Sequence, residues 1–355
     1  MAKQLLSEIT LESFRNHENK SFSLGEVTVI LGNNGSGKTA VLEAISLLSV
    51  ADSWKTDRDT EVVQWEKPFC RVVGGKSEVV VQVNPSLKRY RIDGVSKRLG
   101  DVLGRMPTVL FQPDDSMVIH GSPAGRRALI DRLLSQVVPG YAKNLQLLQK
   151  VLKQRNKLLR QVQDGTASLE ELPYWDGELL SLISQIQPAR EKVIAEITPA
   201  ITRFFHELIP EIGQLTVHYH KSPNTPESLP DDFFAHQRHK EVAAGITLYG
   251  PHREDITFTL DGHPADATLS RGQTRALVLA IKLAELSYIE KVSEVKPILL
   301  LDDIFAEFDR ERRSKIFSLI TKYQTVMTVT DLAGVEENLP KEVTIIQLEP
   351  QKNTP

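Results

Sequence analysis

The sequence predicts an α/β fold: a head with a mixed sheet and an antiparallel β layer, interrupted by an inserted helical, coiled-coil-like arm. Three observations predict it. A strand, a glycine-rich turn and a helix follow one another near the N-terminus, helical apolar spacing fills the middle, and β signals return near Gly245. The expected segments are residues 1–118 for the first half of the head, 119–240 for the arm and 241–355 for the second half.

The first half of the head begins with a strand-loop-helix unit. The stretch "EVTVILGNNGSGKTAVLEAISLL" predicts a buried strand from Val27 to Leu31, a glycine-rich turn, and a helix from about Lys38. Short β-rich runs follow, "CRVV", "EVVVQV" and "KRYRI", and turn signals separate them. These runs predict an antiparallel meander, which forms the second layer of the head.

The arm is predicted from the spacing of apolar residues between about Ser116 and His239. Steps of three and four residues dominate, and they break near "DGTASLEELPYW", where the chain is expected to reverse. Each helix of about 20 residues would project about 30 Å. Pro188 and Pro199 are expected to kink the returning helix or to divide it.

The second half of the head is predicted from five apolar runs. We expect strands at "GITLYG", "ITFTL", "KPILLLDD", "TVMTVT" and "VTIIQL", with the last two closing the sheet. The run "ILLL" before two aspartates has the continuous apolar character of a strand that is buried on both faces.

Composition is that of an ordinary soluble protein, with 41% hydrophobic and 25% charged residues. No apolar run approaches the roughly 18 residues of a membrane span, so we expect a cytoplasmic protein without a membrane partner. A lone cysteine, Cys70, excludes an internal disulfide and lies in an apolar run that favours a structural role. The nine histidines are scattered and form no metal-ligand pattern.

Charge is distributed unevenly along the chain, although the net charge is only −3. Residues 116–163 hold nine basic residues and one acidic residue, a net charge of +8, which leaves −11 for the remainder. This asymmetry indicates either a basic interaction surface or a solvated helical arm.

A phosphate-binding loop is predicted by a full match to G-x-x-x-x-G-K-[ST]. Backbone N–H groups and the helix N-terminus would surround the β-phosphate of ATP, Lys38 would offset β/γ charge, and Thr39 would offer its hydroxyl to Mg²⁺. The nucleotide-binding residues expected here are Gly32, Asn33, Asn34, Gly35, Ser36, Gly37, Lys38, Thr39 and Ala40.

Two aspartates and a polar loop complete the predicted site. Asp302 ends the apolar strand and is expected to hold Mg²⁺, while Asp303 is expected to accept a proton from the attacking water. The loop at Ser270, Gly272 and Gln273 opens a helix and is a third candidate for binding an anion. Simpler interpretations are that the aspartates cap a turn and that Ser270 caps the helix.

The order and spacing of these motifs resemble the ABC-type P-loop ATPase heads of the group that includes SMC and RecF proteins. The stretches "LESFRNHE", "SPAGRRALIDRLLSQ", "VLKQRNKLL", "YGPHRED", "LVLAIKLAEL" and "LLDDIFAEFD" extend the resemblance over nearly the whole chain to the RecF family of recombination-repair ATPases. The resemblance implies that Ser270 faces the γ-phosphate of ATP held by a second protomer. Lys38, Ser270 and Asp303 would then form the catalytic set.

The resemblance also assigns roles by position. Arg15 would touch nucleotide unless it is an ordinary strand-end charge, Gln112 would be the glutamine that links magnesium to the arm, and Asp309 would close a loop at the dimer interface. His252 matches the family hallmark, although a histidine satisfied in the core fits as well. Asp303 stands where transporter ATPases have glutamate, and "TVMTVTDL" lacks a switch histidine, so slow hydrolysis is expected.

The expected function is that of an ATP-induced homodimer that clamps duplex DNA without reading its sequence. The resemblance further implies action at gap junctions, recombinase loading, and RecO and RecR proteins as partners. The alternatives are an SMC-like structural or defence ATPase and, with less support, a transporter ATPase subunit. The predicted DNA contacts are Lys88, Arg89, Arg91, Arg126, Arg127, Lys150, Lys153 and Lys157.

Overall fold

The computed structural model describes two compact units of the chain. The described residues are 6–56, 58–223, 229–307, 313–314, 316–318, 321–332, 336 and 339–349. One unit combines Met1–Asp115 with Lys282–Pro355, and the other is Ser116–Ile281. The sequence placed the second division at 240/241 instead. Residues 241–281 group with the arm because β10 (Asp255–Leu260) pairs with β9 (Leu215–His220).

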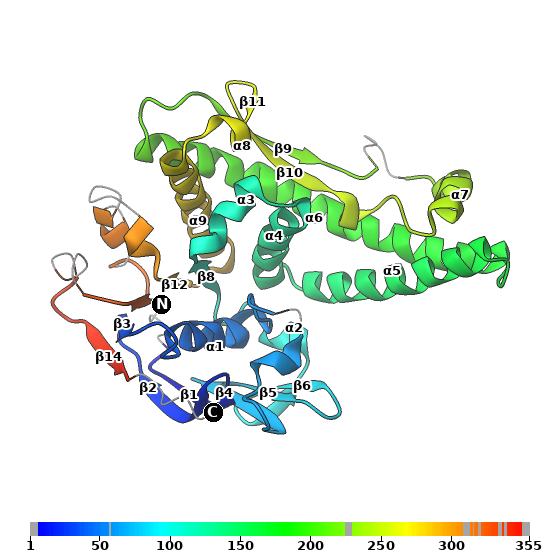
Figure 1. Cartoon of the computed structure of the whole chain (residues 1–355). Helices are drawn as coiled ribbons and strands as arrows, with labels where there is room; N and C mark the ends of the chain where they lie inside the picture. The colour runs from blue at the N-terminus through cyan, green and yellow to red at the C-terminus, as the bar shows by residue number, and fades with distance from the viewer. Residues whose placement is uncertain are drawn as a thin grey trace. The chain divides into compact units, whose positions relative to one another are not determined.

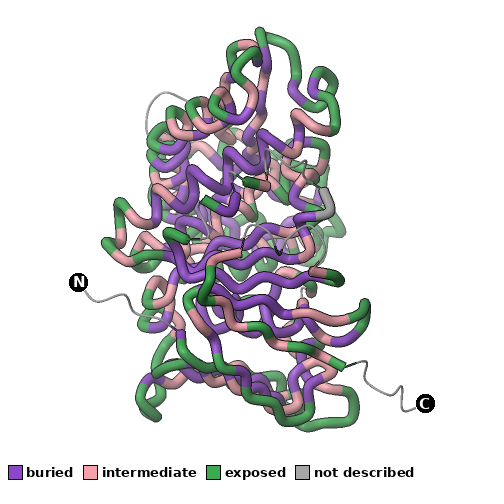
Figure 2. The backbone as a smooth tube through the Cα atoms, turned by 90° about the vertical axis from the view of Figure 1, so that its left-hand side faces the viewer, coloured by how far each residue is buried: buried purple, intermediate pink, exposed green. Residues whose placement is uncertain are grey.

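A parallel sheet forms the centre of the first unit (Figure 1), in the order β14-β3-β13-β12-β8. Its strands are β3 (Val27–Gly32), β8 (Thr108–Phe111), β12 (Ile298–Asp302), β13 (Thr325–Val329) and β14 (Thr344–Leu348). Strands β8, β12 and β13 are buried over their whole length (Figure 2), as continuous apolar runs predict for strands covered on both faces. Because the strands are parallel, their carboxyl ends meet at one edge of the sheet.

An antiparallel sheet is the second layer of this unit, in the order β2-β1-β4-β5-β6-β7. Its strands are β1 (Glu8–Phe14), β2 (His17–Ser23), β4 (Phe69–Gly74), β5 (Ser77–Gln82), β6 (Leu87–Ile92) and β7 (Val95–Lys97). Apolar side chains from β1, β4 and β5 share a core with α1 (Lys38–Val50) and the parallel sheet. The predicted meander and the two-layer α/β head are therefore confirmed.

Cys70 lies in that core on β4 and is fully buried. Burial raises the pKa of its thiol to about 12, which keeps the side chain protonated and unreactive at neutral pH. The short helical elements of the head are η1 (Asp59–Val62), α2 (Leu99–Val102), η2 (Pro113–Ser116) and η5 (Ile304–Glu307).

The second unit is built around two long helices, α5 (Tyr141–Gln163) and α6 (Leu172–Leu208). Their facing apolar positions form a seam that includes Leu148 and Val151 of α5 and Leu179 and Ile183 of α6. The smaller elements are α3 (Met117–His120), α4 (Pro123–Val137), η3 (Leu169–Glu171), α7 (Phe233–Ala244), η4 (Pro251–Arg253), β11 (His263–Pro264) and α8 (Ala265–Thr268). A further helix, α9 (Arg271–Ser293), begins in this unit and ends in the other.

Helix α6 continues through both of its prolines, so of the two expected outcomes, a kink or a division, the division is wrong. Pro188 and Pro199 lie on the exposed side of the helix, while the buried face is apolar on both sides of each. The Thr198 hydroxyl donates to the carbonyl of Ile194 at 2.6 Å, one turn before Pro199. Packing of the long buried face therefore outweighs the loss of two backbone hydrogen bonds.

Two β expectations around the arm also differ from the structure. The segment 245–250 is irregular, because its backbone groups bond to side chains: Thr247 N–H donates to Asn156 Oδ1 at 2.7 Å, and Leu248 N–H donates to Glu241 Oε1 at 2.9 Å. Conversely, β9 lies inside the stretch that apolar spacing assigned to helix. Its pairing with β10, far along the chain, decides its conformation.

Candidate nucleotide site

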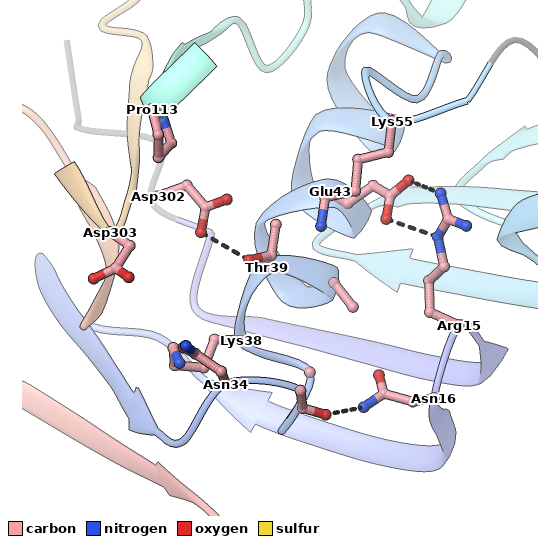
Figure 3. Close-up of a pocket in the computed structure, with 13 residues that line it drawn as sticks. Arg15, Asn16, Asn34, Lys38, Thr39, Glu43, Lys55, Pro113, Asp302 and Asp303 are labelled. Carbon is pink, nitrogen blue, oxygen red and sulfur yellow. Dashed lines mark hydrogen bonds and ion pairs between the residues drawn. The ribbon is translucent and has the colours of Figure 1, made fainter. Parts of the chain in front are cut away.

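A cleft of about 680 Å³ opens at the carboxyl edge of the parallel sheet. The loops after β3 and β12 form it together with the start of α1 and the turn between β1 and β2 (Figure 3). Ligands bind at this edge in open α/β sheets, because loops and helix N-termini converge there. The lining residues are Arg15, Asn16, Asn34, Gly35, Gly37, Lys38, Thr39, Ala40, Glu43, Lys55, Pro113, Asp302 and Asp303.

The loop after β3 has the shape and donors of a phosphate cradle. Gly35 and Gly37 adopt left-handed φ angles of 83° and 96°, and nothing lies within 4 Å of a Cβ added to Gly35. Gly37 precedes α1 and supplies no side-chain cap, so the first N–H groups of the helix remain available to an anion. The buried hydroxyl of Ser36 has no partner among the described residues.

Lys38 reaches back over this loop. Its ammonium donates to the carbonyls of Gly32 at 2.6 Å and Asn33 at 3.1 Å, and only 6% of the residue is exposed. Burial lowers the pKa of Lys38, and the nearby carboxylates of Asp303 and Asp302 partly offset this effect. Together with the Ser36 hydroxyl, this ammonium fits the oxygens of a triphosphate.

Thr39 and Asp302 meet at the start of α1 and the end of β12. The Thr39 hydroxyl donates to Asp302 Oδ1 at 2.9 Å, and the Thr328 hydroxyl of β13 donates to the same oxygen at 2.8 Å (Figure 3 shows the Thr39 contact). A hydroxyl and a carboxylate that is held by a second hydroxyl are hard oxygen donors. These residues fit a Mg²⁺ ion that also contacts phosphates.

Asp303 follows Asp302 with a left-handed φ of 50°, and its N–H donates to Thr328 Oγ1 at 3.0 Å. Burial raises the pKa of Asp303; Lys38 opposes this shift and Asp302 adds to it. A raised pKa makes a carboxylate a stronger proton acceptor. The loop therefore points two adjacent carboxylates into one cleft in different environments.

Arg15 lines the cleft but is held by a carboxylate. Its guanidinium forms a bidentate pair with Glu43 at 2.9 Å and 2.5 Å and donates to the carbonyl of Glu61 at 2.7 Å. Glu43 is only 1% exposed and also accepts a hydrogen bond from Ser53. The structure thus places Arg15 at the expected site and gives it a partner that sequence reasoning did not identify.

Of the expected nucleotide-binding residues in the first unit, Gln112 is not among those that line the cleft, and neither are Gly32, Asn33 and Ser36 of the loop. Gln112 is half-buried after β8 and its N–H donates to Asp115 Oδ2 at 2.9 Å, while its neighbour Pro113 lines the cleft. Asp309 lies outside the described residues.

The Ser270 loop lies in the second unit at the start of α9. Ser270 N–H donates to Gln273 Oε1 at 2.9 Å, and Gln273 N–H donates to Ser270 Oγ at 3.3 Å. This reciprocal pair is a capping box, which satisfies two N–H groups at the helix start. Ser270 is exposed although it caps the helix, so the loop is open to solvent.

Three of the residues expected to contact DNA are occupied within the fold. Arg126 forms a bidentate pair with Asp255 at 2.7 Å and 2.8 Å, and Arg127 donates to the carbonyl of Glu254 at 2.6 Å. Lys88 pairs with Asp59 and donates to the carbonyl of Ala51 at 2.7 Å. These side chains anchor segments to each other and are not part of an exposed basic surface. The charge count alone could not distinguish an arginine or lysine that joins segments of the fold from one that belongs to an exposed basic surface.

The remaining basic residues except the half-buried Arg91 are exposed, and most lie on one helix. Arg89 is exposed on β6, and Arg91 shares Glu78 with Arg71. On α5, basic residues recur at steps of seven, three, four and three, which places them on one face. None of them forms an ion pair within the described parts of the chain. We call this face the α5 basic stripe: Lys143, Lys150, Lys153, Lys157 and Arg160.

The family hallmark segment, residues 249–255, makes hydrogen bonds with the backbone just before it in the second unit. His252 Nε2 contacts the carbonyl of Thr247 at 3.2 Å, and Arg253 donates to the same carbonyl at 3.0 Å. Burial lowers the pKa of His252 to about 4. The expectation of a satisfied core histidine is met only in part, because Nε2 contacts Thr247 while the buried Nδ1 has no partner among the described residues.

Besides Pro113, which follows the predicted Gln112, sequence reasoning missed five residues that line or support the cleft. Three carried a signal: Asn16 and His17 stand within a stretch that was already singled out, and Glu43 is a carboxylate on a helix face that is otherwise apolar. Lys55 and Thr328 carried none, because a lysine after a helix and a threonine in a strand are ordinary. These five reach the site only through pairing and packing in three dimensions.

Comparison with known proteins assigns the chain to a family. The family described as RecF/RecN/SMC N terminal domain matches residues 5–349. A DNA replication and repair protein RecF from Moorella thermoacetica is 35% identical over 335 residues, covering 92% of this chain and 90% of the relative. The corresponding protein of Heliobacterium modesticaldum is 34% identical, covering 92% of each chain.

Solved structures agree with this assignment. A structure described as the recombination mediator protein RecF-ATP in the RecFOR pathway superimposes with a TM-score of 0.84 at 28% identity, covering 92% of each chain. An Smc head bound to a domain of ScpA has a TM-score of 0.53 at 17% identity, which shows the fold alone. Among the described helices, none has the length and apolarity that a bilayer span requires. With its complete P-loop cleft and these similarities, the chain is an ABC-type ATPase that belongs to the RecF family.

Proposed function

We propose that ATP joins two copies of this chain head to head, that the dimer holds duplex DNA, and that slow hydrolysis releases it. The observation that carries this proposal is the division of the anion-binding elements. The P-loop, Thr39 and both aspartates belong to one compact unit, whereas the Ser270 loop opens α9 in the other unit and is exposed. A second copy would supply its own Ser270 loop to the γ-phosphate.

The P-loop, Thr39, Asp302 and Asp303 each have a role in this proposal. The N–H groups at the start of α1 and the ammonium of Lys38 bind the β- and γ-phosphates. Thr39 and Asp302 would hold Mg²⁺, which supplies positive charge to the same phosphates when it is bound. Asp303, whose pKa is raised by burial, accepts the proton of the attacking water. Its short side chain fits slow turnover better than rapid cycling.

Size-exclusion chromatography with light scattering, with and without ATP, tests the dimer. Ser270→Arg places a bulky cation where the partner's γ-phosphate would lie, so it should abolish dimerisation and leave ATP binding to each copy intact. Lys38→Met should abolish both ATP binding and dimerisation. A Ser270→Arg protein that dimerises normally with ATP would show that the loop does not face a partner's nucleotide.

DNA is the proposed partner of the α5 basic stripe. Its five exposed cations lie on one helix face, have no carboxylate partners among the described residues, and can contact a row of phosphates. Phosphate contacts carry no sequence information, so binding would not depend on the base sequence. Arg89 is a further exposed candidate, whereas Arg126, Arg127 and Lys88 are assigned to the fold. Relatives named as DNA replication and repair proteins support DNA as the ligand.

Protein partners are proposed from the relatives alone. One similar structure is described as a recombination mediator in the RecFOR pathway. We propose accordingly that this chain acts with RecO and RecR proteins at gap junctions to load recombinase. Co-elution of the ATP-bound chain with purified RecR protein on gapped DNA tests this step, and separate elution under all nucleotide conditions would refute it.

A further inference from the structure

The turn between β1 and β2 lies directly behind the P-loop. Its residues Arg15 and Asn16 join Phe14 to His17, which are paired across the hairpin. His17 Nε2 lies 3.1 Å from the carbonyl oxygen of Gly37, and Asn16 Nδ2 donates to the carbonyl of Gly35 at 3.4 Å, as Figure 3 shows for Asn16. Both contacts hold backbone carbonyls of the loop, and Asn16 also lines the cleft.

The direction of the Gly37 carbonyl sets the direction of the next N–H group. In a planar trans peptide, the C=O of one residue and the N–H of the next point in opposite directions. A carbonyl held against His17 therefore turns the Lys38 N–H to the opposite side of the loop. That N–H is the first of α1, and Gly37 provides no side-chain cap for the helix. The same carbonyl accepts the Ala40 N–H at 3.1 Å, so His17 and the start of the helix hold it together, and an anion in the cleft can bind the N–H that they orient.

Space around Gly37 shows that this brace is tight. A Cβ added to Gly37 would lie 2.6 Å from His17 Nε2 and 2.7 Å from the side-chain atoms of Asn16. Any larger residue at position 37 would push the loop away from His17 and Asn16. It would also be strained by the φ of 96°. Gly35 is different, since no atom lies within 4 Å of a Cβ added there. One side of the loop is filled by the hairpin and the other is left for phosphate.

His17 itself is held firmly. It is 1% exposed, and its ring packs edge-on against Phe22 with centroids 5.6 Å apart. Because a carbonyl oxygen only accepts hydrogen bonds, Nε2 must carry the proton, which leaves Nδ1 as an acceptor. Nδ1 is buried and has no partner among the described residues. A buried polar atom without a partner destabilises the fold, so the ring costs stability while it braces the loop.

We propose that His17 is a positioning residue for nucleotide binding: it fixes the Gly37 carbonyl from behind and so aims the Lys38 N–H at the phosphates of ATP. Asn16 supports the same loop through Gly35. The inference depends on nucleotide binding by the P-loop and is independent of dimerisation and of DNA.

Two substitutions separate this role from a merely structural one. His17→Phe keeps a ring against Phe22, removes the N–H and removes the orphan acceptor. It should weaken binding of ATP and ADP about five- to tenfold, as expected for one lost hydrogen bond, and leave the nucleotide-free protein at least as stable as wild type. His17→Gln carries an amide N–H at similar reach and should restore affinity to within about threefold.

Isothermal titration with ATP and ADP, paired with thermal unfolding of the nucleotide-free full chain, provides the measurement. His218→Phe is the matched control, because His218 is an exposed histidine on the other unit whose ring is hydrogen-bonded to Thr259. The nucleotide affinity of this variant should equal that of wild type. Lys38→Met should bind neither nucleotide. Unchanged affinity in His17→Phe overturns the proposal. So does a joint loss of affinity and stability that His17→Gln fails to rescue, because that pattern describes a structural residue.

Discussion

At the residue scale, single buried polar residues hold separate segments of this fold together. Asp302 is held by two threonine hydroxyls, Glu43 by a bidentate arginine, and Thr247 by a side-chain amide. Each of these contacts joins segments far apart in the sequence. A buried polar group without its partner is costly, so each contact limits the arrangements that its segments can adopt.

His252 should make the stability of the second unit depend on pH. Its pKa is about 4 in the folded chain, below the value of about 6.5 for an exposed histidine, because burial disfavours its charged form. The unfolded chain therefore binds more protons between these values, and stability present at neutral pH is lost as pH falls. Between about pH 7.5 and about pH 5, His252 should contribute a loss of about 1 to 2 kcal/mol.

Urea unfolding at both pH values, followed by circular dichroism, measures this loss. His252→Gln retains a donor for the Thr247 carbonyl and cannot be protonated, so the difference between the two pH values should shrink by the same amount. An identical pH difference in wild type and variant would show that other groups account for the titration.

At the element scale, the arm is held together by two buried arginines. Arg155 of α5 pairs with Asp176 of α6 and Glu241 of α7 while only 1% of its side chain is exposed, and Arg190 of α6 pairs with Asp131 and Glu254 in the same way. Both arginines lie on helices whose sequence pattern is amphipathic. The burial of Arg155 shows that part of the positive charge between residues 116 and 163 is internal.

The exposed part of that charge leads to a prediction for DNA binding. Reversing Lys150, Lys153 and Lys157 to glutamate on the α5 basic stripe should weaken binding to duplex DNA of any sequence. If each lysine neutralises one phosphate, the slope of log K against log salt should become shallower by about 3. Fluorescence anisotropy across a salt series measures both effects.

A matched control changes the net charge equally without touching the stripe. Lys20, Lys192 and Lys240 are exposed on three separate elements, and their reversal to glutamate should leave most of the salt slope in place. Equal losses in the two triple variants would mean that overall charge attracts DNA, with no role for the stripe.

At the scale of the whole molecule, the proposed cycle separates binding from hydrolysis. Asp303→Asn retains the shape of the cleft and removes the proposed proton acceptor. Hydrolysis should fall by a factor of about 10² to 10⁴, the usual contribution of a general base, and the ATP-bound dimer should persist for correspondingly longer.

Light scattering after removal of free ATP follows the lifetime of that dimer. Asp114→Asn, at an exposed aspartate outside the cleft lining, should dissociate like wild type. Rapid dissociation of Asp303→Asn would remove Asp303 from the role of base.

Sequence alone predicted the parts of this protein that local patterns encode. The P-loop is consecutive in the chain, Asp302 directly follows an apolar run, and the apolar spacing of α5 and α6 repeats every three or four residues, in α6 across two prolines. Each could therefore be recognised from residues that are close in the sequence. The segment 245–250 shows the limit: it reads as a strand, yet side chains from two helices take its backbone hydrogen bonds.

Tertiary structure alone decided which polar groups meet. Arg126 and Asp255 are 129 positions apart, and Thr39 and Asp302 are 263 apart, so no local pattern distinguishes a paired arginine from one that faces solvent. The contact between His17 and Gly37 likewise exists only because a hairpin folds behind the loop. Local spacing specifies most of the backbone conformation, whereas the burial and pairing of charges, and the conformation of segments such as β9, depend on distant segments that come together only when the chain folds.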